Sequence, residues 1–311
     1  MGDTVRIAVI LPCYNEAVAI AKVVKSFARA LPSARIHVFD NRSTDATVAE
    51  ARAAGAVVHS VTARGKGNVI RRMFADVDAD IYVMADGDDT YEAEAAPGMV
   101  RKLQEEGLDM VVGSRVSGSA GAYRPGHRLG NLLLTRCVAL LFGDTFTDML
   151  SGYRVFSRRY VKSFPASATG FETETELTVH ALQLRMPVAE VATRYGERPE
   201  GSVSKLNTWR DGFRVLLTIV RLLKSERPLM FFTGAFALCC AAAVWLAVPL
   251  FQVYLQTGLV PRIPTAVLCT GLVLFGVVLL ACGLVLNTVT RGRIEAKRFA
   301  YLAQPLPPGP G

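Results

Sequence analysis

The chain has 311 residues, of which 51% are hydrophobic, and its mean hydropathy of +0.29 is high for a protein that is soluble throughout. The formal net charge of +8 is compatible with nucleic-acid binding, but the sequence contains no RNA- or DNA-binding signature, which argues against that class of partner. The six cysteines have the spacing neither of a metal site nor of a disulfide framework, and they fit a reducing compartment.

Short apolar runs alternate with helical patterns from the start of the chain. The predicted strands are Arg6–Leu11, Arg35–Asp40, Ala56–Val61, Ile81–Ala85 and Leu108–Gly113. The predicted helices between them are Glu16–Leu31, Thr44–Ala54, Asn68–Val77 and Glu92–Glu106. Such short apolar strands indicate a parallel sheet that is buried on both faces and wound by right-handed crossovers. In sheets of this kind ligands bind beyond the carboxyl ends of the strands.

Two further helices are predicted after the fifth strand, Leu129–Phe142 and Lys205–Lys224. The second is amphipathic and basic, and it leads directly into a long apolar segment. This pattern is typical of a helix that lies on a membrane surface, although packing on the globular domain is an alternative that does not exclude it.

Two segments near the C-terminus, Leu229–Leu255 and Ile263–Val289, contain no charged residue. Each exceeds the roughly 20 apolar residues that one helical crossing of a bilayer requires. A pair of buried helices in a soluble core is the alternative, but core helices rarely run this long without a charge. Basic residues gather on the outer sides of both segments, whereas the connecting loop carries only Arg262. The positive-inside rule therefore places both ends, and the large N-terminal domain, in the cytoplasm.

An acidic turn, Asp86-Gly87-Asp88-Asp89, follows the fourth predicted strand. The carboxylates of Asp86 and Asp88 can converge on one cation, and Gly87 permits a close approach. Mg²⁺ and Mn²⁺ prefer such hard oxygen ligands and complete their shells with water and phosphate oxygens. The turn therefore predicts a divalent cation that neutralises a leaving diphosphate, with an ordinary acidic loop as the alternative.

Polar residues also follow the first two predicted strands. They are Pro12, Tyr14, Asn15, Glu16, Asp40 and Asp45. Taken alone, Asn15 and Asp45 are best interpreted as helix N-caps. Their joint placement around one crevice instead favours a nucleotide site, in which Tyr14 covers a base and Asp40 accepts a base N–H. The sequence has neither a G-x-G-x-x-G fingerprint nor a P-loop, which argues against dinucleotide and NTPase sites.

Five motifs of the chain resemble, in the same order, those of glycosyltransferase family 2. They are Pro12-x-Tyr14-Asn15-Glu16, the Asp-rich turn at Asp40–Asp45, Asp86-x-Asp88, Gly113-Ser114-Arg115 and Ser151-Gly152-Tyr153-Arg154. With its two C-terminal spans, the chain is similar to the branch of dolichol-phosphate mannose synthases and bacterial polyprenyl-phosphate glycosyltransferases. The resemblance implies an α/β GT-A fold with a C-terminal two-helix transmembrane hairpin, an inverting mechanism, Mg²⁺ or Mn²⁺, and a polyprenyl phosphate acceptor.

The resemblance also implies roles for individual residues. The nucleotide would be bound by Pro12, Tyr14, Asn15, Glu16, Asp40, Asp45 and Asp86, and the metal by Asp86 and Asp88. The acceptor phosphate would be bound by Arg115, Arg128, Arg198 and Lys205, and catalysis would rest on Asp88, Asp148 and Arg115. Two departures from the family pattern concern the metal and the phosphate clamp. Thr90 stands where some members have a glutamine that ligates the metal, and the spacing from Arg198 to Lys205 is one residue longer.

Asp148 is the carboxylate expected near the anomeric carbon of the donor. It would orient the acceptor or act as a base, and a structural role as a cap or as a partner of Arg154 is an equal alternative. A phosphate monoester, with a second pKa of about 6, is already an anionic nucleophile at neutral pH and requires no strong base.

The sequence, together with what its resemblance to glycosyltransferase family 2 implies, therefore predicts inverting transfer of a sugar from a nucleotide-sugar donor to undecaprenyl or dolichyl phosphate, in building the cell envelope. One alternative is a membrane-bound glycosyltransferase that uses a saccharide or glycolipid acceptor in polysaccharide synthesis. Processive synthases of that kind carry Gln-x-x-Arg-Trp, whereas neither Trp209 nor Trp245 follows an arginine in this chain. A non-enzymatic lipid-sugar flippase or scaffold is less compatible with only two spans and an intact acidic turn.

The predicted organisation is a catalytic domain at 1–204, an amphipathic juxtamembrane helix at 205–228, two transmembrane helices within 229–290 and a cytoplasmic tail at 291–311. These features predict a multi-pass protein of the cell inner membrane whose catalytic domain is cytoplasmic. Its expected partners are the nucleotide sugar, the lipid phosphate and the bilayer, without nucleic acid, and both a monomer and a homo-oligomer are compatible with the sequence.

Overall fold

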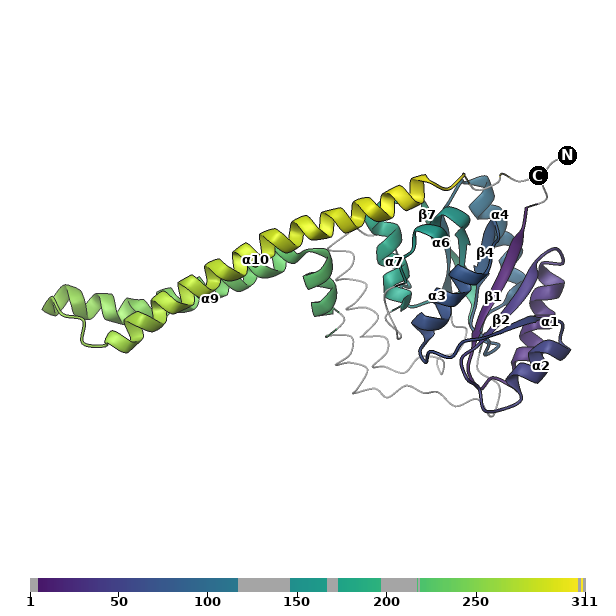
Figure 1. The fold of residues 1–311 in the computed structure, drawn as a ribbon, viewed down its shortest axis with the longest axis horizontal. Helices are drawn as coiled ribbons and strands as arrows, with labels where there is room; N and C mark the ends of the chain where they lie inside the picture. The colour runs from purple at the N-terminus through teal and green to yellow at the C-terminus, as the bar shows by residue number, and fades with distance from the viewer. Residues whose placement is uncertain are drawn as a thin grey trace. The chain divides into compact units, whose positions relative to one another are not determined.

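The computed structural model describes residues 5–116, 146–166, 173–196, 217, 219–306 and 309. The chain forms two compact units, Met1–Phe213 together with Ala296–Gly311, and Arg214–Glu295. The first unit is an α/β domain, and the second consists mainly of two long helices (Figure 1).

Within the described residues, the α/β domain contains a seven-stranded sheet of order β3-β2-β1-β4-β6-β5-β7. The strands are β1 (Ile7–Cys13), β2 (Arg35–Asp40), β3 (Val57–Ser60), β4 (Ile81–Met84), β5 (Met110–Val116), β6 (Arg154–Ser157) and β7 (Val188–Arg194). The five predicted strands are confirmed, and β1 pairs in parallel with β2 and β4. The sheet is nevertheless mixed, because β6 runs antiparallel between β4 and β5.

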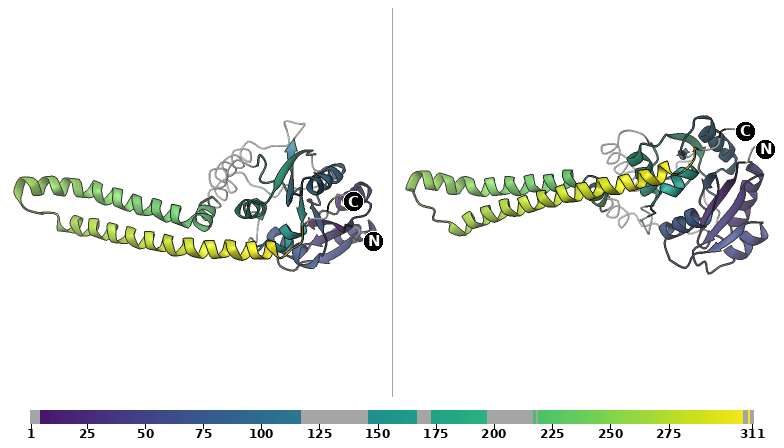
Figure 2. Two further views of the ribbon diagram at one scale, coloured as in Figure 1. Left: turned by 90° about the horizontal axis from the view of Figure 1, so that it is seen from above. Right: turned by 45° about the horizontal axis from the view of Figure 1, so that its top comes forward.

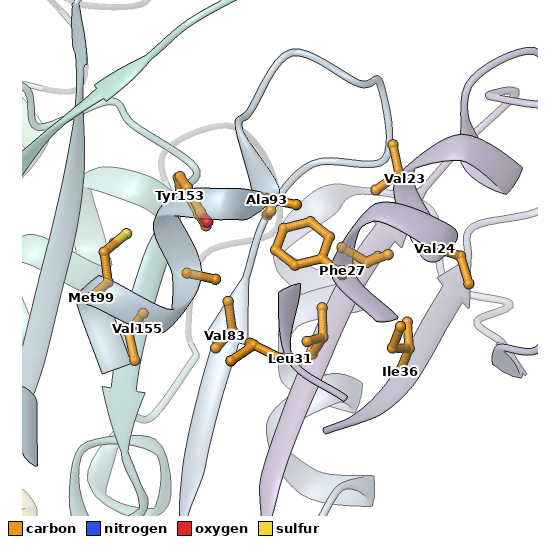
Figure 3. Close-up of a cluster of buried hydrophobic side chains, with 14 of the residues drawn as sticks. Val23, Val24, Phe27, Leu31, Ile36, Val83, Ala93, Met99, Tyr153 and Val155 are labelled. Carbon is orange, nitrogen blue, oxygen red and sulfur yellow. The ribbon is translucent and has the colours of Figure 1, made fainter. Parts of the chain in front are cut away.

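Helices cover both faces of this sheet (Figure 1). They are α1 (Ile20–Ala30), α2 (Thr47–Ala53), α3 (Lys66–Asp76), η1 (Ala93–Ala95), α4 (Ala96–Glu105), α6 (Arg158–Ser163) and α7 (Thr173–Leu184). On one face, Phe27 of α1 packs in a buried cluster with Val83 and Val155 of the strands (Figure 3). On the other face, Phe74 of α3 packs edge-on against Tyr82. Because successive strand residues alternate between the faces, β4 is buried on both sides, as predicted.

Two buried histidines lie away from the carboxyl edge of the sheet. Nδ1 of His37 on β2 is 3.0 Å from Nε2 of His59 on β3. His180 on α7 packs its ring edge-on against Tyr160 and Phe164. Burial, and then the nearby positive charge of His59, lowers the pKa of His37 to about 4. Burial, and then the charge of Lys297, lowers the pKa of His180 to about 3.

We expect the protein to lose stability as the pH falls below about 6.5, the ordinary pKa of histidine. The unfolded chain protonates His37 and His180 near that pH, whereas the folded chain resists protonation until their depressed pKa values are reached. The contribution of the two histidines to the free energy of unfolding is therefore fully present above pH 6.5. Between pH 6.5 and 5 the free energy of unfolding falls by about 2 kcal/mol per histidine. Urea midpoints of the full chain in detergent measure this loss. His37→Gln should make the pH dependence shallower, and a constant midpoint from pH 7 to 5 would contradict the expectation.

The second unit contains α9 (Pro228–Thr257) and most of α10 (Ile263–Leu302), which are long and apolar enough to be candidate membrane spans. The two helices run antiparallel (Figure 2). Gly283 of α10 lies so close to α9 that a Cβ there would be 2.7 Å from Cβ of Phe232. Gly276, two turns earlier, lies against Phe236 in the same way. Small residues at this spacing permit the close backbone approach on which helix packing in membranes depends.

The helix α10 continues beyond the predicted span to Leu302, so that much of the segment expected to be a tail is helical. Its last turns belong to the α/β domain. Tyr301 Oη donates a hydrogen bond of 2.8 Å to the buried carboxylate of Asp109, and Lys297 Nζ donates one of 2.7 Å to Gln183 Oε1. The end of α10 therefore completes the environment of a buried charge at the start of β5.

Candidate active site

The loops after β1 and β2 are joined by polar contacts among the residues predicted to bind a nucleotide. Asn15 Oδ1 accepts the Thr44 N–H at 2.8 Å, and Asp45 Oδ2 accepts the Ala17 N–H at 3.2 Å. Asp45 also accepts the N–H of Thr47 at the start of α2, at 3.0 Å. The prediction that Asn15 and Asp45 are helix N-caps is wrong, because the N-cap residues of α1 and α2 are Ala19 and Ala46. The two side chains instead join the loop after β1 to the loop after β2.

The other predicted nucleotide residues lie on or beside the same loops. The carboxylate of Asp40 accepts the N–H groups of Arg42 and Ser43, each at 3.2 Å, which fixes the turn after β2. Pro12 lies within β1 and is half-buried, and the backbone N–H of Glu16 donates to Thr47 Oγ1 at 2.8 Å. Tyr14 is 42% exposed, so that its ring can contact a ligand at this edge.

The acidic turn after β4 gives its three aspartates different surroundings. Asp88 is buried, and its Oδ1 accepts the Thr90 hydroxyl at 2.6 Å. Asp89 turns away with φ of +59° and pairs with Lys22 at 2.5 Å. At Gly87 an added Cβ would lie 2.4 Å from Sγ of Cys13, so that only glycine permits this approach to β1. Thr90 stands where some family members have a glutamine, and its hydroxyl contact orients the carboxylate of Asp88.

Lys66 is a candidate site residue that the sequence analysis did not name. Its ammonium lies 2.6 Å from Oδ1 of Asp86 and 2.7 Å from Oε1 of Glu174. Burial lowers the pKa of Lys66, but the two carboxylates outweigh this effect and raise its pKa above the ordinary value. The sequence pattern that could have indicated Lys66 is Gly65-Lys66-Gly67. Lys66 is the first residue of α3, and Gly65, with φ of +116°, precedes it. A glycine-flanked lysine at a helix N-terminus is a common setting for phosphate groups.

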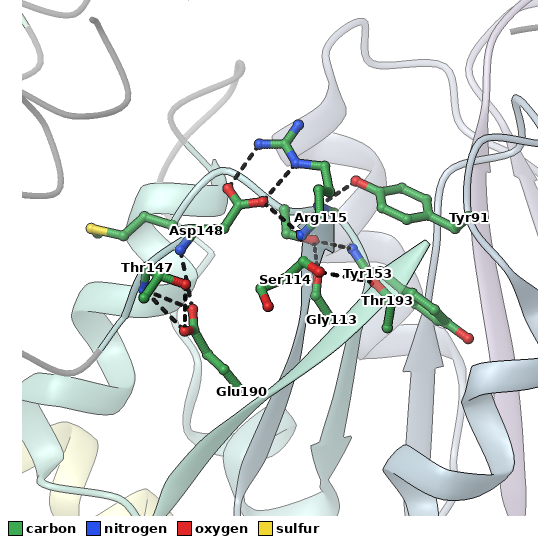
Figure 4. Close-up of polar contacts among 12 residues, drawn as sticks. Tyr91, Gly113, Ser114, Arg115, Thr147, Asp148, Tyr153, Glu190 and Thr193 are labelled. Atoms are coloured by element: carbon green, nitrogen blue, oxygen red, sulfur yellow. Dashed lines mark hydrogen bonds and ion pairs between the residues drawn. The ribbon is translucent and has the colours of Figure 1, made fainter. Parts of the chain in front are cut away.

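Arg115 and Asp148, predicted separately, form one ion pair (Figure 4). Nε of Arg115 donates to Oδ2 of Asp148 at 2.7 Å, Nη2 donates to Oδ1 at 2.8 Å, and the Arg115 backbone N–H donates to Oδ2 at 3.2 Å. Burial by itself raises the pKa of Asp148, but the hydrogen bonds and charge of Arg115 outweigh it, and the pKa lies below its usual value. The pair is thus a fixed, bidentate charge pair near the end of β5.

Arg154 has a different role from the pairing with Asp148 that the sequence left open. It is fully buried and donates to the carbonyl oxygens of Met149 at 2.7 Å and Ser151 at 2.9 Å. It also donates to Oγ1 of Thr178 on α7 at 2.9 Å. Arg154, which ends the Ser-Gly-Tyr-Arg motif, therefore fixes the segment that carries Asp148.

Aromatic residues connect the acidic turn with the Arg115–Asp148 pair. The Gly152 N–H donates to Tyr91 Oη at 2.9 Å, and a Cβ on Gly152 would lie 2.8 Å from Oδ2 of Asp86. The ring of Tyr91 is 5.4 Å from that of Tyr195, over which the Arg115 guanidinium lies at 5.5 Å. Lys66, the acidic turn and the Arg115–Asp148 pair therefore belong to one continuous region, which we call the carboxyl-edge site. Arg128, Arg198 and Lys205 lie outside the described residues.

The donor set at the carboxyl-edge site suits a divalent cation that is only partly held by protein. Among the described residues, no three histidine, cysteine or acidic side chains gather into a metal site. Asp86 and Asp88 nevertheless offer hard oxygen donors two residues apart, and Asp86 already holds the cationic Lys66. Such a pair fits Mg²⁺ or Mn²⁺ that takes its remaining ligands from phosphate and water.

Comparison with known proteins agrees with this geometry. The model of the family described as glycosyl transferase family 2 matches residues 8–164. The glycosyltransferase AglJ of Haloferax volcanii is 34% identical over 299 residues, covering 95% of this chain and 98% of that protein. The chain therefore belongs to glycosyltransferase family 2, and it is a glycosyltransferase.

Two further relatives bear on the fold and the ligands. The dolichyl-phosphate hexose transferase of H. volcanii is 29% identical over 222 residues, covering 71% of this chain and 95% of that protein. Glucosyl-3-phosphoglycerate synthase of Mycobacterium tuberculosis, solved with Mn²⁺, uridine diphosphate and glucosyl-3-phosphoglycerate, is 26% identical with a TM-score of 0.58, covering 71% of this chain and 79% of that one. The predicted GT-A fold is confirmed by this likeness.

Proposed function

We propose that the protein transfers a sugar, with inversion, from a nucleotide-sugar donor to a polyprenyl phosphate at the cytoplasmic face of the membrane. The observation that carries the proposal is the pairing of Asp148 with Arg115. An aspartate that is held by two guanidinium hydrogen bonds, and whose pKa is depressed, is a poor general base. This favours an acceptor that arrives already ionised, as a phosphate monoester does.

The charges of the carboxyl-edge site support two anionic substrates. Lys66 is a half-buried cation next to Asp86, and Arg115 is a second cation on the other side of Tyr91 and Tyr195. Asp86 and Asp88 would hold a divalent cation, which when bound neutralises the charge of the departing diphosphate. One region would thus receive the donor diphosphate and the acceptor phosphate, whose mutual repulsion the two basic residues reduce.

The reaction that fits these positions is a single displacement. An oxygen of the acceptor phosphate forms a bond to the anomeric carbon while the bond from that carbon to the diphosphate oxygen breaks, and the electron pair leaves with the nucleoside diphosphate. No proton has to be removed from the attacking oxygen. Arg115 would orient the acceptor, with Arg128, Arg198 and Lys205 as further phosphate contacts, and the loops at Tyr14 and Asp40 would bind the nucleotide.

The two candidate spans support a lipid acceptor. Both α9 and α10 expose apolar side chains along their length, including Trp245 of α9 and Leu274 of α10. The basic residues on the outer sides of the spans favour a cytoplasmic α/β domain in a multi-pass inner-membrane protein. The relative named as a dolichyl-phosphate hexose transferase agrees with this assignment.

Acceptor competition in detergent tests the proposal. The full chain is given a panel of labelled nucleotide sugars together with polyprenyl phosphate, free polyprenol, a neutral glycolipid and a soluble oligosaccharide. We expect label in the polyprenyl phosphate alone, because only that acceptor carries the anionic nucleophile. Faster labelling of the oligosaccharide or of the neutral glycolipid would overturn the assignment and favour polysaccharide synthesis.

A further inference from the structure

Glu190 lies on the edge strand β7 and was not among the residues predicted from the sequence. Its two carboxylate oxygens accept the Thr147 N–H at 2.9 and 3.0 Å, and Oε2 also accepts the Thr147 hydroxyl at 2.8 Å. Oε1 accepts the next backbone N–H, that of Asp148, at 3.1 Å. One side chain thus fixes two successive amides, as Figure 4 shows.

The segment that Glu190 fixes is not held by the hydrogen bonds of a helix or a strand. Residues 146–151 belong to no helix or strand. Hydrogen bonds to an ionised acceptor are roughly twice as strong as those between neutral groups. Glu190 therefore holds the outer side of this segment, and Arg154 holds its carbonyl groups from within.

The same segment sets the position of Arg115. The backbone N–H of Asp148 is bound by Glu190, while the carboxylate of Asp148 receives three hydrogen bonds from Arg115. A shift of the 147–148 backbone must therefore move the carboxylate and, with it, the guanidinium. Neither Glu190 nor Thr147 contacts Arg115 in any of these bonds, so that the influence passes through Asp148.

We infer that Glu190 is a positioning residue for the acceptor phosphate, acting through the 147–148 backbone and Asp148 on the guanidinium of Arg115. The inference rests on the proposed role of Arg115 in binding that phosphate. It assigns to an edge-strand glutamate, outside the nucleotide and metal residues, control over one substrate and not the other.

The first experiment needs no acceptor. Phenylglyoxal modifies accessible guanidinium groups, and mass spectrometry of the labelled full chain reports the modification of each arginine. The side chain of Arg115 is 16% exposed and bidentately paired, whereas that of Arg72 is 58% exposed and serves as the internal reference. We expect Glu190→Gln to raise labelling of Arg115 several-fold and to leave Arg72 unchanged. The matched control is Glu106→Gln, which breaks an exposed pair with Lys102 elsewhere in the domain and should change neither arginine.

The second experiment measures KM for each substrate. Glu190→Gln should raise the KM for polyprenyl phosphate about 10-fold, while the donor KM stays within experimental error, because misplacing a binding group by about 1 Å costs up to about 100-fold. Thr147→Ser, which keeps both the amide and the hydroxyl, should behave like the natural chain. Thr147→Val removes only the hydroxyl donor and should raise the acceptor KM by a smaller factor. This variant tests the inference if Glu190→Gln does not fold.

The outcomes separate the two proposals. Unchanged labelling of Arg115 in folded Glu190→Gln and Thr147→Val would overturn the positioning role, whatever the acceptor is. Equal rises in the donor and acceptor KM would do the same, because they indicate a general loss of structure. If Arg115 labelling rises as expected but the natural chain does not glycosylate polyprenyl phosphate, the control of Arg115 by Glu190 stands, whereas the proposed acceptor, and with it the role of Glu190 toward that acceptor, fails.

Discussion

Replacement of Asp88 by asparagine is expected to lower the rate of sugar transfer by about 10²–10³-fold, the cost of removing one preorganised electrostatic stabiliser. Asp88 is buried, and the Thr90 hydroxyl fixes its Oδ1 at 2.6 Å. Asparagine keeps the shape of the side chain and can still accept the hydrogen bond, so that the fold should survive. The substitution removes the negative charge that would hold a divalent cation beside the leaving diphosphate.

The adjacent aspartate provides a matched control. Asp89 pairs with Lys22, whose side chain is 70% exposed, and an exposed pair of this kind contributes about 0–1 kcal/mol. Asparagine also tolerates the φ of +59° at this position. Asp89→Asn should therefore retain nearly the natural rate. Turnover of both variants is measured across a titration of Mg²⁺ or Mn²⁺, with EDTA as the zero point. Equal losses in both, or full activity of Asp88→Asn in EDTA, would remove the metal role.

The fold could be predicted from the sequence where the pattern is local. The first five strands are short and apolar and are separated by helical periods, and each appears where the pattern predicts it. Strand β6 was not predicted because it has only four residues and begins at Arg154, the last residue of the Ser-Gly-Tyr-Arg motif. The polar residues of that motif favoured a functional interpretation. The antiparallel direction of β6 depends on the path of the chain after β5, which no local pattern encodes.

Residues of the candidate site could be proposed from the sequence where they follow strand ends, but not where distant parts of the chain bring them together. Asp86 and Asp88 could be found because they stand immediately after β4. The Gly65-Lys66-Gly67 pattern was present in the sequence, but the contact of Lys66 with Glu174 could not be predicted, because Glu174 lies on another helix far along the chain. Asp148 was found, but its partner could not be read from spacing, because three hydrogen bonds to Arg115 arise only when β5 and the segment before β6 are brought together.

Replacement of Arg115 by alanine is expected to weaken use of polyprenyl phosphate far more than binding of the nucleotide sugar. The alanine removes the guanidinium that would hold the acceptor, whereas Lys66, which lies beside the donor residues, is unchanged. Truncating one partner also leaves Asp148 buried without its charge partner, and the loss of a buried pair costs about 3–5 kcal/mol. The double variant Arg115→Ala, Asp148→Asn therefore separates loss of acceptor binding from burial of an unpaired charge. It should be more stable than the single variant but no better at using the acceptor.

Lysine at position 115 tests the geometry of the contact rather than its charge. Arg115 presents Nε and Nη2 to the two oxygens of Asp148, a planar fork that an ammonium cannot reproduce. Arg115→Lys should therefore rescue acceptor use only in part, because it supplies the charge without the fixed orientation. Transfer by the natural chain should also slow below a pH of about 6, where the acceptor phosphate loses its second charge. Initial rates with saturating donor and varied polyprenyl phosphate, measured from pH 5 to 8, test both points. Full activity of Arg115→Lys would mean that the charge alone is sufficient and that the planar fork is not needed. A donor KM that rises in step with the acceptor KM in Arg115→Ala would mean that Arg115 supports the fold of the site and does not bind the acceptor.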